Sequence, residues 1–182
     1  MIEPVYLRAL ELSDAALVHT WHNDRNLYEL LGGPFHFVSR HAVEAWLDRK
    51  TSYAASSDEV SLAICVAASG KHIGNIYLRH INWITSHAEM QILIGDSSER
   101  SKGYGSSALR QILSYAFNDL GLNRIYLYVL TENATAAHSY EKNGFSLEGT
   151  LRGHIMKQGC RKDVHIMAIS AGEYLHRLES SA

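Results

Sequence analysis

The chain has 182 residues, a length typical of one domain, and 46% of them are hydrophobic, which is ample for a core. Its formal net charge of −2 argues against a nucleic acid or a membrane surface as the main partner. It contains no apolar run of about 18 residues that would predict a transmembrane helix, and its start, MIEPVYLRAL, lacks the basic and apolar parts of a signal peptide. We expect one domain over residues 1–182, located in the cytoplasm.

Cysteine and histidine do not show the spacings of a disulfide framework or of a metal site. The two cysteines, Cys65 and Cys160, are too few for a framework, which agrees with a reducing compartment. The eleven histidines include no H-E-x-x-H and no cluster with cysteine. We therefore expect no metal site and interpret the histidines as scattered surface and core residues.

The N-terminal part of the chain predicts a strand and two helices. Val5–Ala9 is expected to be the strand, and Ser13-Asp14 is typical of an N-cap before a helix over Ala15–His22. Trp21–Phe37 is irregular and rich in aromatic residues, and glycine and proline interrupt it. A second helix is expected from Ser39 to about Arg49.

The middle of the chain predicts a hairpin followed by a βαβ unit. A polar loop over residues 51–59 precedes the two hairpin strands, Val60–Val66 and Lys71–Ile81. Met90–Ile94 is a short apolar run typical of a buried strand, and a Gly-rich loop and a helix connect it to a strand at Arg124–Leu130. Strand, helix and strand together predict a right-handed crossover between two parallel strands.

The C-terminal part predicts a helix, two strands and a short final helix. The first helix begins at Asn133 and is closed by Gly144. The strands are expected at Phe145–Leu151 and Lys162–Ser170, with a turn between them, and the final helix at Glu173–Leu178. This order of elements predicts an α/β fold with one mixed, mostly antiparallel sheet in a single domain.

The loop after the strand Met90–Ile94 has the features of an anion site. Backbone N–H groups at the start of a helix have no partners within the helix, and with the helix dipole they favour a phosphate. Gly103 and Gly105 allow a close approach, and Arg100 and Lys102 add positive charge. The alternative is a tight strand-to-helix turn with two solvated basic residues.

Two other glycine loops are excluded by their spelling. The P-loop requires G-x-x-x-x-G-K-[ST], which is absent, and the dinucleotide fingerprint requires a third glycine where this chain has Ala108. Residues Arg100–Gly105 instead match the pattern [QR]-x-x-G-x-[GA]. This loop resembles the pyrophosphate loop of the GNAT superfamily of N-acetyltransferases, which hold acetyl-coenzyme A (acetyl-CoA).

A second resemblance to the same superfamily runs from Asn133 to Phe145. The family pattern N-x-x-A-x-x-x-Y-[EQ]-[KR]-x-G-F is matched here, with Tyr140 as its tyrosine. The resemblance implies the GNAT fold, in which the central parallel strands splay apart to admit the coenzyme. It implies acetyl-CoA as co-substrate, bound by Ile92, Leu93, Ile94, Arg100, Ser101, Lys102, Gly103, Tyr104, Gly105, Ser106, Asn133 and Tyr140.

The resemblance also implies a direct acetyl transfer with Tyr140 as the general acid. In the family its hydroxyl lies near the coenzyme thiol, where it can protonate the leaving thiolate. Asn133 and Tyr140 are two helical turns apart and so share one helix face. Asn133 can cap the helix while it faces the pantetheine arm. The plainer alternative is that Asn133 is only an N-cap and Tyr140 only a core aromatic residue.

Glu89 is the candidate general base, because an ammonium group must lose a proton before it attacks the thioester. It opens an apolar strand, and strand alternation puts it on one face with Gln91 and Leu93. A buried carboxylate requires a reason. The structural reason would be a pair with Arg79 or His80 on the neighbouring strand, and the catalytic reason would be proton transfer. His80 and His87 are further candidates.

The acceptor amine is left open by the sequence. The opening of the chain and its last strands resemble the RimJ/RimL-like branch, which acetylates protein N-terminal amines and has relatives that act on polyamines and other small amines. A small-molecule amine and a peptide amine are both possible. Trp21–Phe37 is expected to form the acceptor pocket, where Asp24 and Glu29 would suit a cationic amine and Arg25 a phosphate or carboxylate, unless they are solvated.

Two other classes of function are alternatives to an enzyme. A non-catalytic acetyl-CoA-binding sensor would keep Arg100–Gly105 but would need neither Glu89 nor Tyr140. A nucleotide-binding protein is disfavoured by the spelling of the loop. The protein is expected to act as a monomer or a homodimer, with no nucleic acid and no membrane as partner.

Overall fold

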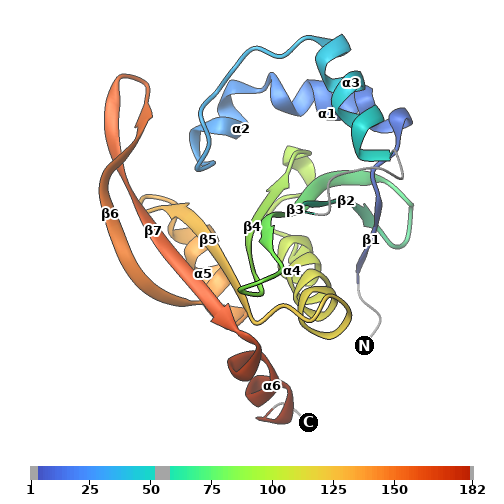
Figure 1. The fold of residues 1–182 in the computed structure, drawn as a ribbon. Coiled ribbons are helices and arrows are strands. Elements are labelled where there is room, and N and C mark those ends of the chain that lie inside the picture. Colours follow the sequence, from blue (N-terminus) through green and yellow to red (C-terminus); the bar gives the residue numbers. More distant parts are fainter. Residues whose placement is uncertain (1–3, 52–57, 181–182) are drawn as a thin grey trace.

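A computed structural model describes residues 4–51 and 58–180, so most of the polar loop predicted at 51–59 lies outside the described residues. Seven strands form one sheet in the order β1-β2-β3-β4-β5-β7-β6, with helices on both faces (Figure 1). The elements are β1 Val5–Ala9, α1 Ala15–His22, α2 Arg25–Glu29, α3 Arg40–Thr51, β2 Val60–Val66, β3 His72–Asn82, β4 His87–Ile94, α4 Tyr104–Ser114, β5 Arg124–Leu130, α5 Ala134–Lys142, β6 Ser146–Lys157, β7 Cys160–Ser170 and α6 Ala171–Ser180.

The centre of the sheet contains its parallel pair. β4 and β5 are parallel, and their pairing is limited to three positions, from His87↔Arg124 to Glu89↔Tyr126. The other neighbouring strands are antiparallel. Beyond Glu89 the ribbons of β4 and β5 diverge, as Figure 1 shows. The predicted mixed sheet with a splayed parallel pair is confirmed.

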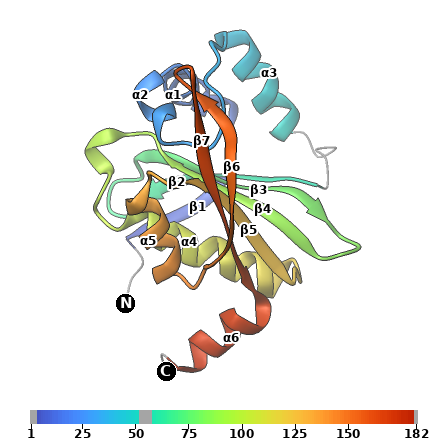
Figure 2. The same cartoon turned by 90° about the vertical axis from the view of Figure 1, so that its left-hand side faces the viewer.

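Two hydrophobic clusters fill the two sides of the sheet. The larger one packs α4 against the sheet and includes Ile112 and Met90, whereas the other packs α1 and α3 against Tyr77. In Figure 2, α4 and α5 lie below the sheet and α1, α2 and α3 lie above it. Ile92 joins the cluster of α4 and Leu93 that of α1 and α3. The predicted alternation along β4 is therefore confirmed.

Asp14 does not cap α1 with its side chain, contrary to the prediction. Its carboxylate accepts two hydrogen bonds of 2.8 Å from Arg8 and lies 3.1 Å from Nδ1 of His72. Burial alone would raise the pKa of Asp14, but the hydrogen bonds from Arg8 and from the backbone of Glu11 lower it overall. The carboxylate thus connects β1, the start of α1 and β3 instead of capping the helix.

The other elements differ from the predictions mainly in length. α2 forms inside the stretch that was expected to be irregular, and a π-helix over Tyr115–Asp119 extends α4. β6 and β7 are longer than predicted, because both continue to the turn at Gln158-Gly159. Gly121 and Gly144 have φ values of 64° and 99°, as expected for glycines that end helices.

Candidate active site

One cavity of about 930 Å³ opens where β4 and β5 separate. Its walls come from β4, the loop before α4, the first turn of α4, α5, residues 22–38, β3 and the β6–β7 pair. Glu89, Tyr140 and every predicted coenzyme-binding residue except Lys102 line it. Segments far apart in the sequence therefore meet at one site, with the anion loop at one end and residues 22–38 at the other.

The anion loop presents backbone donors to this cavity. Gly103 is the N-cap of α4 with a φ of 80°, and it has no side chain to satisfy the first N–H groups of the helix. A Cβ atom at Gly103 or Gly105 would meet no atom within 4 Å. The space in front of these N–H groups is thus open, and it fits a diphosphate held by the helix N-terminus.

The two basic residues of this loop are used differently from the prediction. Arg100 lines the cavity, but its guanidinium donates to the carbonyls of Ile94 at 3.0 Å and Gly95 at 3.2 Å, which holds the loop against the end of β4. Lys102 does not line the cavity, because its ammonium lies 2.8 Å from Glu99. The backbone, more than the lysine, makes this end of the cavity suitable for an anion.

Glu89 lies on the cavity wall with its side chain 13% exposed. It accepts a hydrogen bond of 2.6 Å from Gln91, and Nε2 of His80 lies 3.9 Å away. Arg79 faces Glu89 in the β3–β4 register, but its ion pair is with Glu59 at 3.6 Å. Of the two structural partners expected for Glu89, only the exposed His80 lies near its carboxylate. The carboxylate is therefore accessible for proton transfer.

Tyr140 lies on the opposite wall, on α5. Its ring packs edge-on against Phe145 with 5.8 Å between centroids. Burial raises the pKa of Tyr140 to about 12, because the phenolate would lose its hydration. The hydroxyl is therefore protonated near neutral pH and is able to donate.

Asn133 fulfils the predicted capping role and also contacts the segment that follows α2. Its side-chain oxygen accepts from the backbone of Ala136 at 3.1 Å, and its nitrogen donates to the carbonyl of Leu30 at 3.1 Å. The start of α5 is thereby connected to the segment that follows α2. This contact links the two ends of the cavity.

Asn143 does not line the cavity, but it positions the lining residue Ser106, a role that the sequence reasoning missed. Its side-chain nitrogen donates to Ser106 Oγ at 2.6 Å and to the carbonyl of Ser139 at 2.7 Å. The side chain is mostly buried and joins the end of α5 to the first turn of α4. The only signal in the sequence was an amide at the variable position of the second family pattern, between Lys142 and Gly144.

The charged residues expected in the acceptor pocket are engaged elsewhere. Asp24 caps α2 by accepting from the backbone of Asn26 and Leu27, and Arg25 lies over the ring of Phe35 at 4.6 Å. Glu29 accepts from Gln158 at 2.6 Å. Asp24, Arg25 and Glu29 do not line the cavity. The segment contributes mainly backbone, apolar and aromatic groups to it.

The tip of the β6–β7 hairpin holds this segment in place. Lys157 donates to the carbonyl of Tyr28 at 2.7 Å and also to that of Gly33. Burial lowers the pKa of Lys157. Further along β6, His154 stacks on Tyr128 of β5, and both line the cavity. In Figure 1 the tip of the hairpin lies at the height of α2, and the hydrogen bonds of Lys157 join the two.

The comparisons with known proteins agree with this geometry. Residues 5–146 match the acetyltransferase (GNAT) domain family, and the chain belongs to this family. It is 33% identical over 175 residues to the spermidine N(1)-acetyltransferase of Vibrio cholerae, covering 95% of this chain and 96% of the relative. It is 34% identical over 73 residues, 40% of this chain and 45% of the relative, to the L-amino acid N-acetyltransferase AaaT of Escherichia coli.

Solved structures show the same fold. The crystal structure of spermidine N-acetyltransferase from Vibrio cholerae in complex with CoA and spermine superposes with a TM-score of 0.87 at 31% sequence identity. The match covers 96% of this chain and 99% of that chain. The expected GNAT fold and the expected class, an acyl-CoA-dependent N-acetyltransferase, are confirmed. The comparisons do not specifically support the narrower RimJ/RimL-like branch.

Among the described residues, no helix is long and apolar enough to cross a membrane. Within residues 4–51 and 58–180, three or more histidine, cysteine, aspartate or glutamate side chains do not gather as a metal site would require.

Proposed function

We propose that this protein transfers the acetyl group of acetyl-CoA directly to the primary amine of a small molecule. The observation that carries the proposal is the single cavity that joins the anion loop to Glu89, Tyr140 and residues 22–38. Both substrates can meet in it without an intermediate carrier. The relatives support the same class, since their names describe acetylation of spermidine and of L-amino acids.

The coenzyme would lie along β4 with its diphosphate at the start of α4. The open space at Gly103 and Gly105 fits the phosphates, which the backbone N–H groups of residues 101–106 would hold. The edge of β4 that faces away from β3 has no strand partner beyond Glu89. Its free backbone groups can receive the pantetheine arm, with Asn133 on the facing wall.

The chemistry needs one base and one acid, and the cavity offers both. Glu89 takes a proton from the ammonium group, and the neutral nitrogen then attacks the thioester carbonyl. Backbone N–H groups of β4 stabilise the negative oxygen that forms. When the carbon–sulfur bond breaks, Tyr140 gives its proton to the leaving thiolate. The nitrogen, which is positively charged after the attack, loses its second proton as the intermediate collapses, and this proton restores the neutral Tyr140. The products are CoA and an N-acetylated amine, and Glu89 passes its proton to solvent.

A small acceptor is favoured over a protein N-terminus by the way this end of the cavity is enclosed. Lys157 fastens residues 28–33 to the hairpin tip, and this segment carries much of the acceptor-side lining. A peptide would need this contact to open. A sensor module without catalysis would keep the anion loop, but it would give no reason for Glu89 and Tyr140 to share the cavity.

The test is the release of CoA over a panel of amines, with the acetylated product identified by mass spectrometry. The panel includes spermidine, L-amino acids, simple alkylamines and a short peptide with a free N-terminus. We expect one or more small amines to be acetylated with one CoA released per product. Tight acetyl-CoA binding without transfer to any amine would favour the sensor, and transfer only to the peptide would contradict a small acceptor.

A further inference from the structure

We propose that the acceptor carries an anionic group, a carboxylate or a phosphate, which Arg79 binds while Glu89 receives the amine. This inference deepens the proposed function and rests on it. Arg79 and Glu89 are direct partners in the β3–β4 register and both line the cavity. They lie on the side of the sheet that carries Tyr77, at the acceptor end. A guanidinium and a carboxylate that do not pair with each other are thus presented to one ligand.

The guanidinium of Arg79 has hydrogen-bonding capacity to spare. Its Nε is buried and has no hydrogen-bond partner among the described residues, and the nearest carboxylate oxygen there, Oε1 of Glu59, is 3.6 Å away. Arginine has five N–H donors in a planar fork that suits a carboxylate or a phosphate. The side chain is 35% exposed, so a ligand in the cavity can reach it.

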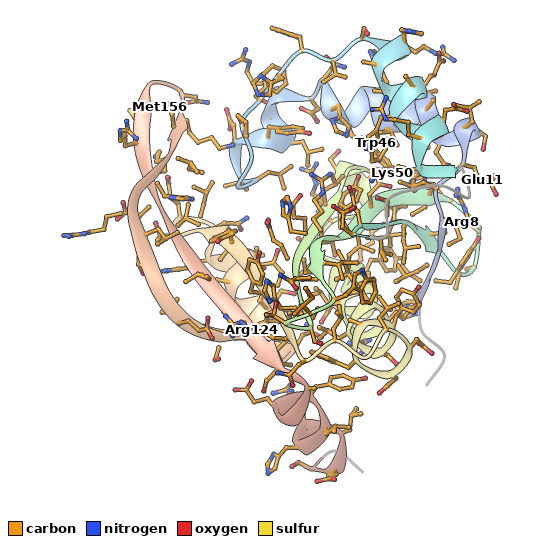
Figure 3. The ribbon with its side chains drawn as sticks, in the orientation of Figure 1. Arg8, Glu11, Trp46, Lys50, Arg124 and Met156 are labelled. Atoms are coloured by element: carbon orange, nitrogen blue, oxygen red, sulfur yellow. The ribbon has the colours of Figure 1, made fainter. Side chains whose placement is uncertain are left out.

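Glu59 cannot neutralise Arg79 fully, because other groups share it. Its Oε2 is 2.5 Å from the ammonium of Lys50, and its Oε1 accepts from Ser61 at 2.9 Å. Lys50 and Arg79 therefore share one carboxylate, so Glu59 does not pair with the guanidinium alone. Lys50 extends from the end of α3 toward β2 and β3 (Figure 3).

Arg79 is also held in place before any ligand arrives. Its guanidinium carbon lies 4.8 Å from the centre of the Tyr77 ring, a cation–π contact. The Tyr77 ring is buried and packs against Trp46 of α3 with 6.3 Å between centroids. A guanidinium fixed in this way loses little freedom when it binds, which favours recognition of a planar anion.

The charges on the cavity wall match an amine that also bears an anion. Among the described lining residues the only carboxylates are Glu89 and Glu99. Glu99 is at the coenzyme end, where Lys71 and Lys102 neutralise it. The acceptor end thus offers Glu89 to an ammonium and Arg79 to an anion. A polyamine would place a second ammonium near the guanidinium, which would repel it.

The experiment compares acceptors in matched pairs that differ in the anionic group. The pairs are L-phenylalanine with phenethylamine, L-methionine with 3-methylthiopropylamine, and O-phosphoethanolamine with ethanolamine, and spermidine is measured beside them. In the following, the member that lacks the anionic group is called the neutral partner, although its amine is protonated like that of the anionic member. We expect at least one anionic member to have a kcat/KM about 10-fold or more above its neutral partner, as expected for a charged hydrogen bond. The amino-acid pairs and the phosphate pair distinguish a carboxylate from a phosphate.

Arg79 variants test whether this preference belongs to the guanidinium. Arg79→Met should lower kcat/KM for the anionic member about 10-fold or more, mainly through KM, and leave its neutral partner and acetyl-CoA affinity unchanged. Arg79→Lys, which keeps the charge, should recover part of the loss. Arg40→Met removes an exposed arginine of α3 that lies outside the cavity and should change nothing. Circular dichroism checks that each variant is folded.

The outcomes separate this inference from the proposed function. Acetylation of spermidine or of the neutral members with no preference for an anion, or an equal loss on both members in Arg79→Met, would overturn the inference and leave the function intact. If no amine is acetylated, the proposed function fails, and calorimetry with N-acetyl-L-phenylalanine decides the inference. Binding that Arg79→Met abolishes would support it, and binding that is absent or unchanged would overturn it.

Discussion

The two ends of the cavity differ in the chemical groups that line them. The coenzyme end consists of backbone: the N–H groups after Gly103 and the edge of β4 beyond Glu89. The acceptor end consists of side chains and loop segments from β3, residues 22–38 and the β6–β7 hairpin. The backbone part of the first comes from one continuous stretch of sequence, from β4 to the start of α4, whereas the second depends on three distant stretches.

This difference explains what can change at each end. A backbone donor survives almost any substitution of its own side chain, and it is lost only when something blocks it or bends the loop. A side chain such as Arg79 is replaced by a single mutation. We therefore expect the coenzyme to be common to a wide group of related enzymes and the acceptor to differ among them.

The largest effect is expected at the coenzyme end. Gly105→Val puts a branched side chain into the open space before the helix N-terminus, and acetyl-CoA affinity should fall about 100-fold or more, because the phosphate contacts are charge-assisted. Calorimetry measures the affinity. Gly105 is a better position for this test than Gly103, whose φ of 80° would be strained by any side chain.

Gly172→Val is the matched control for this prediction. Gly172 is also the second residue of a helix, α6, and a Cβ atom there would likewise meet nothing within 4 Å. Both variants should unfold at temperatures close to that of the parent. Equal acetyl-CoA affinity in the folded Gly105→Val protein would show that the diphosphate lies elsewhere.

The next largest effect is expected from the base, where the two ends meet. Glu89→Gln should lower kcat near pH 7 by about 100-fold, the usual contribution of a general base. Raising the pH should restore part of the lost kcat, because more of the amine is then neutral without a general base. Glu141→Gln, an exposed change on α5, should have the parent's pH–rate profile. If Glu89→Gln has that profile as well, Glu89 is structural and the base is another group.

Tyr140→Phe should affect the chemical step and spare the binding of the coenzyme. The ring contact with Phe145 is kept, so acetyl-CoA affinity should stay within about 2-fold, whereas kcat should fall about 100-fold. Since the pKa of Tyr140 is raised to about 12, its neutral form persists, and its ionisation should not reduce the parent's activity up to about pH 11. A parallel loss of affinity and kcat would indicate a packing role. Tyr6→Phe, at an exposed position of β1, is the control.

The geometry of the loop before α4 and the cap of α5 could be predicted from the sequence because their information is local. Three residues there serve geometric purposes that a sequence pattern can reveal. Gly103 makes a left-handed turn, Gly105 leaves an open approach and Asn133 caps a helix. The acceptor end could not be predicted in the same way. Arg79 gains its meaning only from the register that places it opposite Glu89, and Asp24 looked like a substrate ligand until α2 was seen to use it as a cap.

A smaller effect is expected from loosening the acceptor end. Lys157→Met keeps the length of the side chain but removes both hydrogen bonds to residues 28–33. The KM for the acceptor should rise about 5-fold to 10-fold, and acetyl-CoA affinity should not change, because the diphosphate site is remote. Lys162→Met changes another lysine of the same hairpin, whose ion pair is with Glu132 in the turn after β5, and it is the control. A loss of acetyl-CoA affinity in Lys157→Met would mean that the two ends are coupled.

The smallest effect is expected from the cysteines, and it tests whether transfer is direct at all. Cys65 is fully buried in β2 and Cys160 is exposed at the start of β7, and neither lines the cavity. Cys65→Ala combined with Cys160→Ser should therefore keep kcat within about 2-fold, while the stability falls by about 1 kcal/mol from the small cavity at position 65. Intact-mass spectrometry of the parent after rapid mixing with acetyl-CoA should find no acetylated cysteine. A thioester on either residue, or loss of activity in the folded double variant, would mean that the acetyl group reaches the amine through a covalent intermediate, and the roles given to Glu89 and Tyr140 would then have to be assigned to two separate steps.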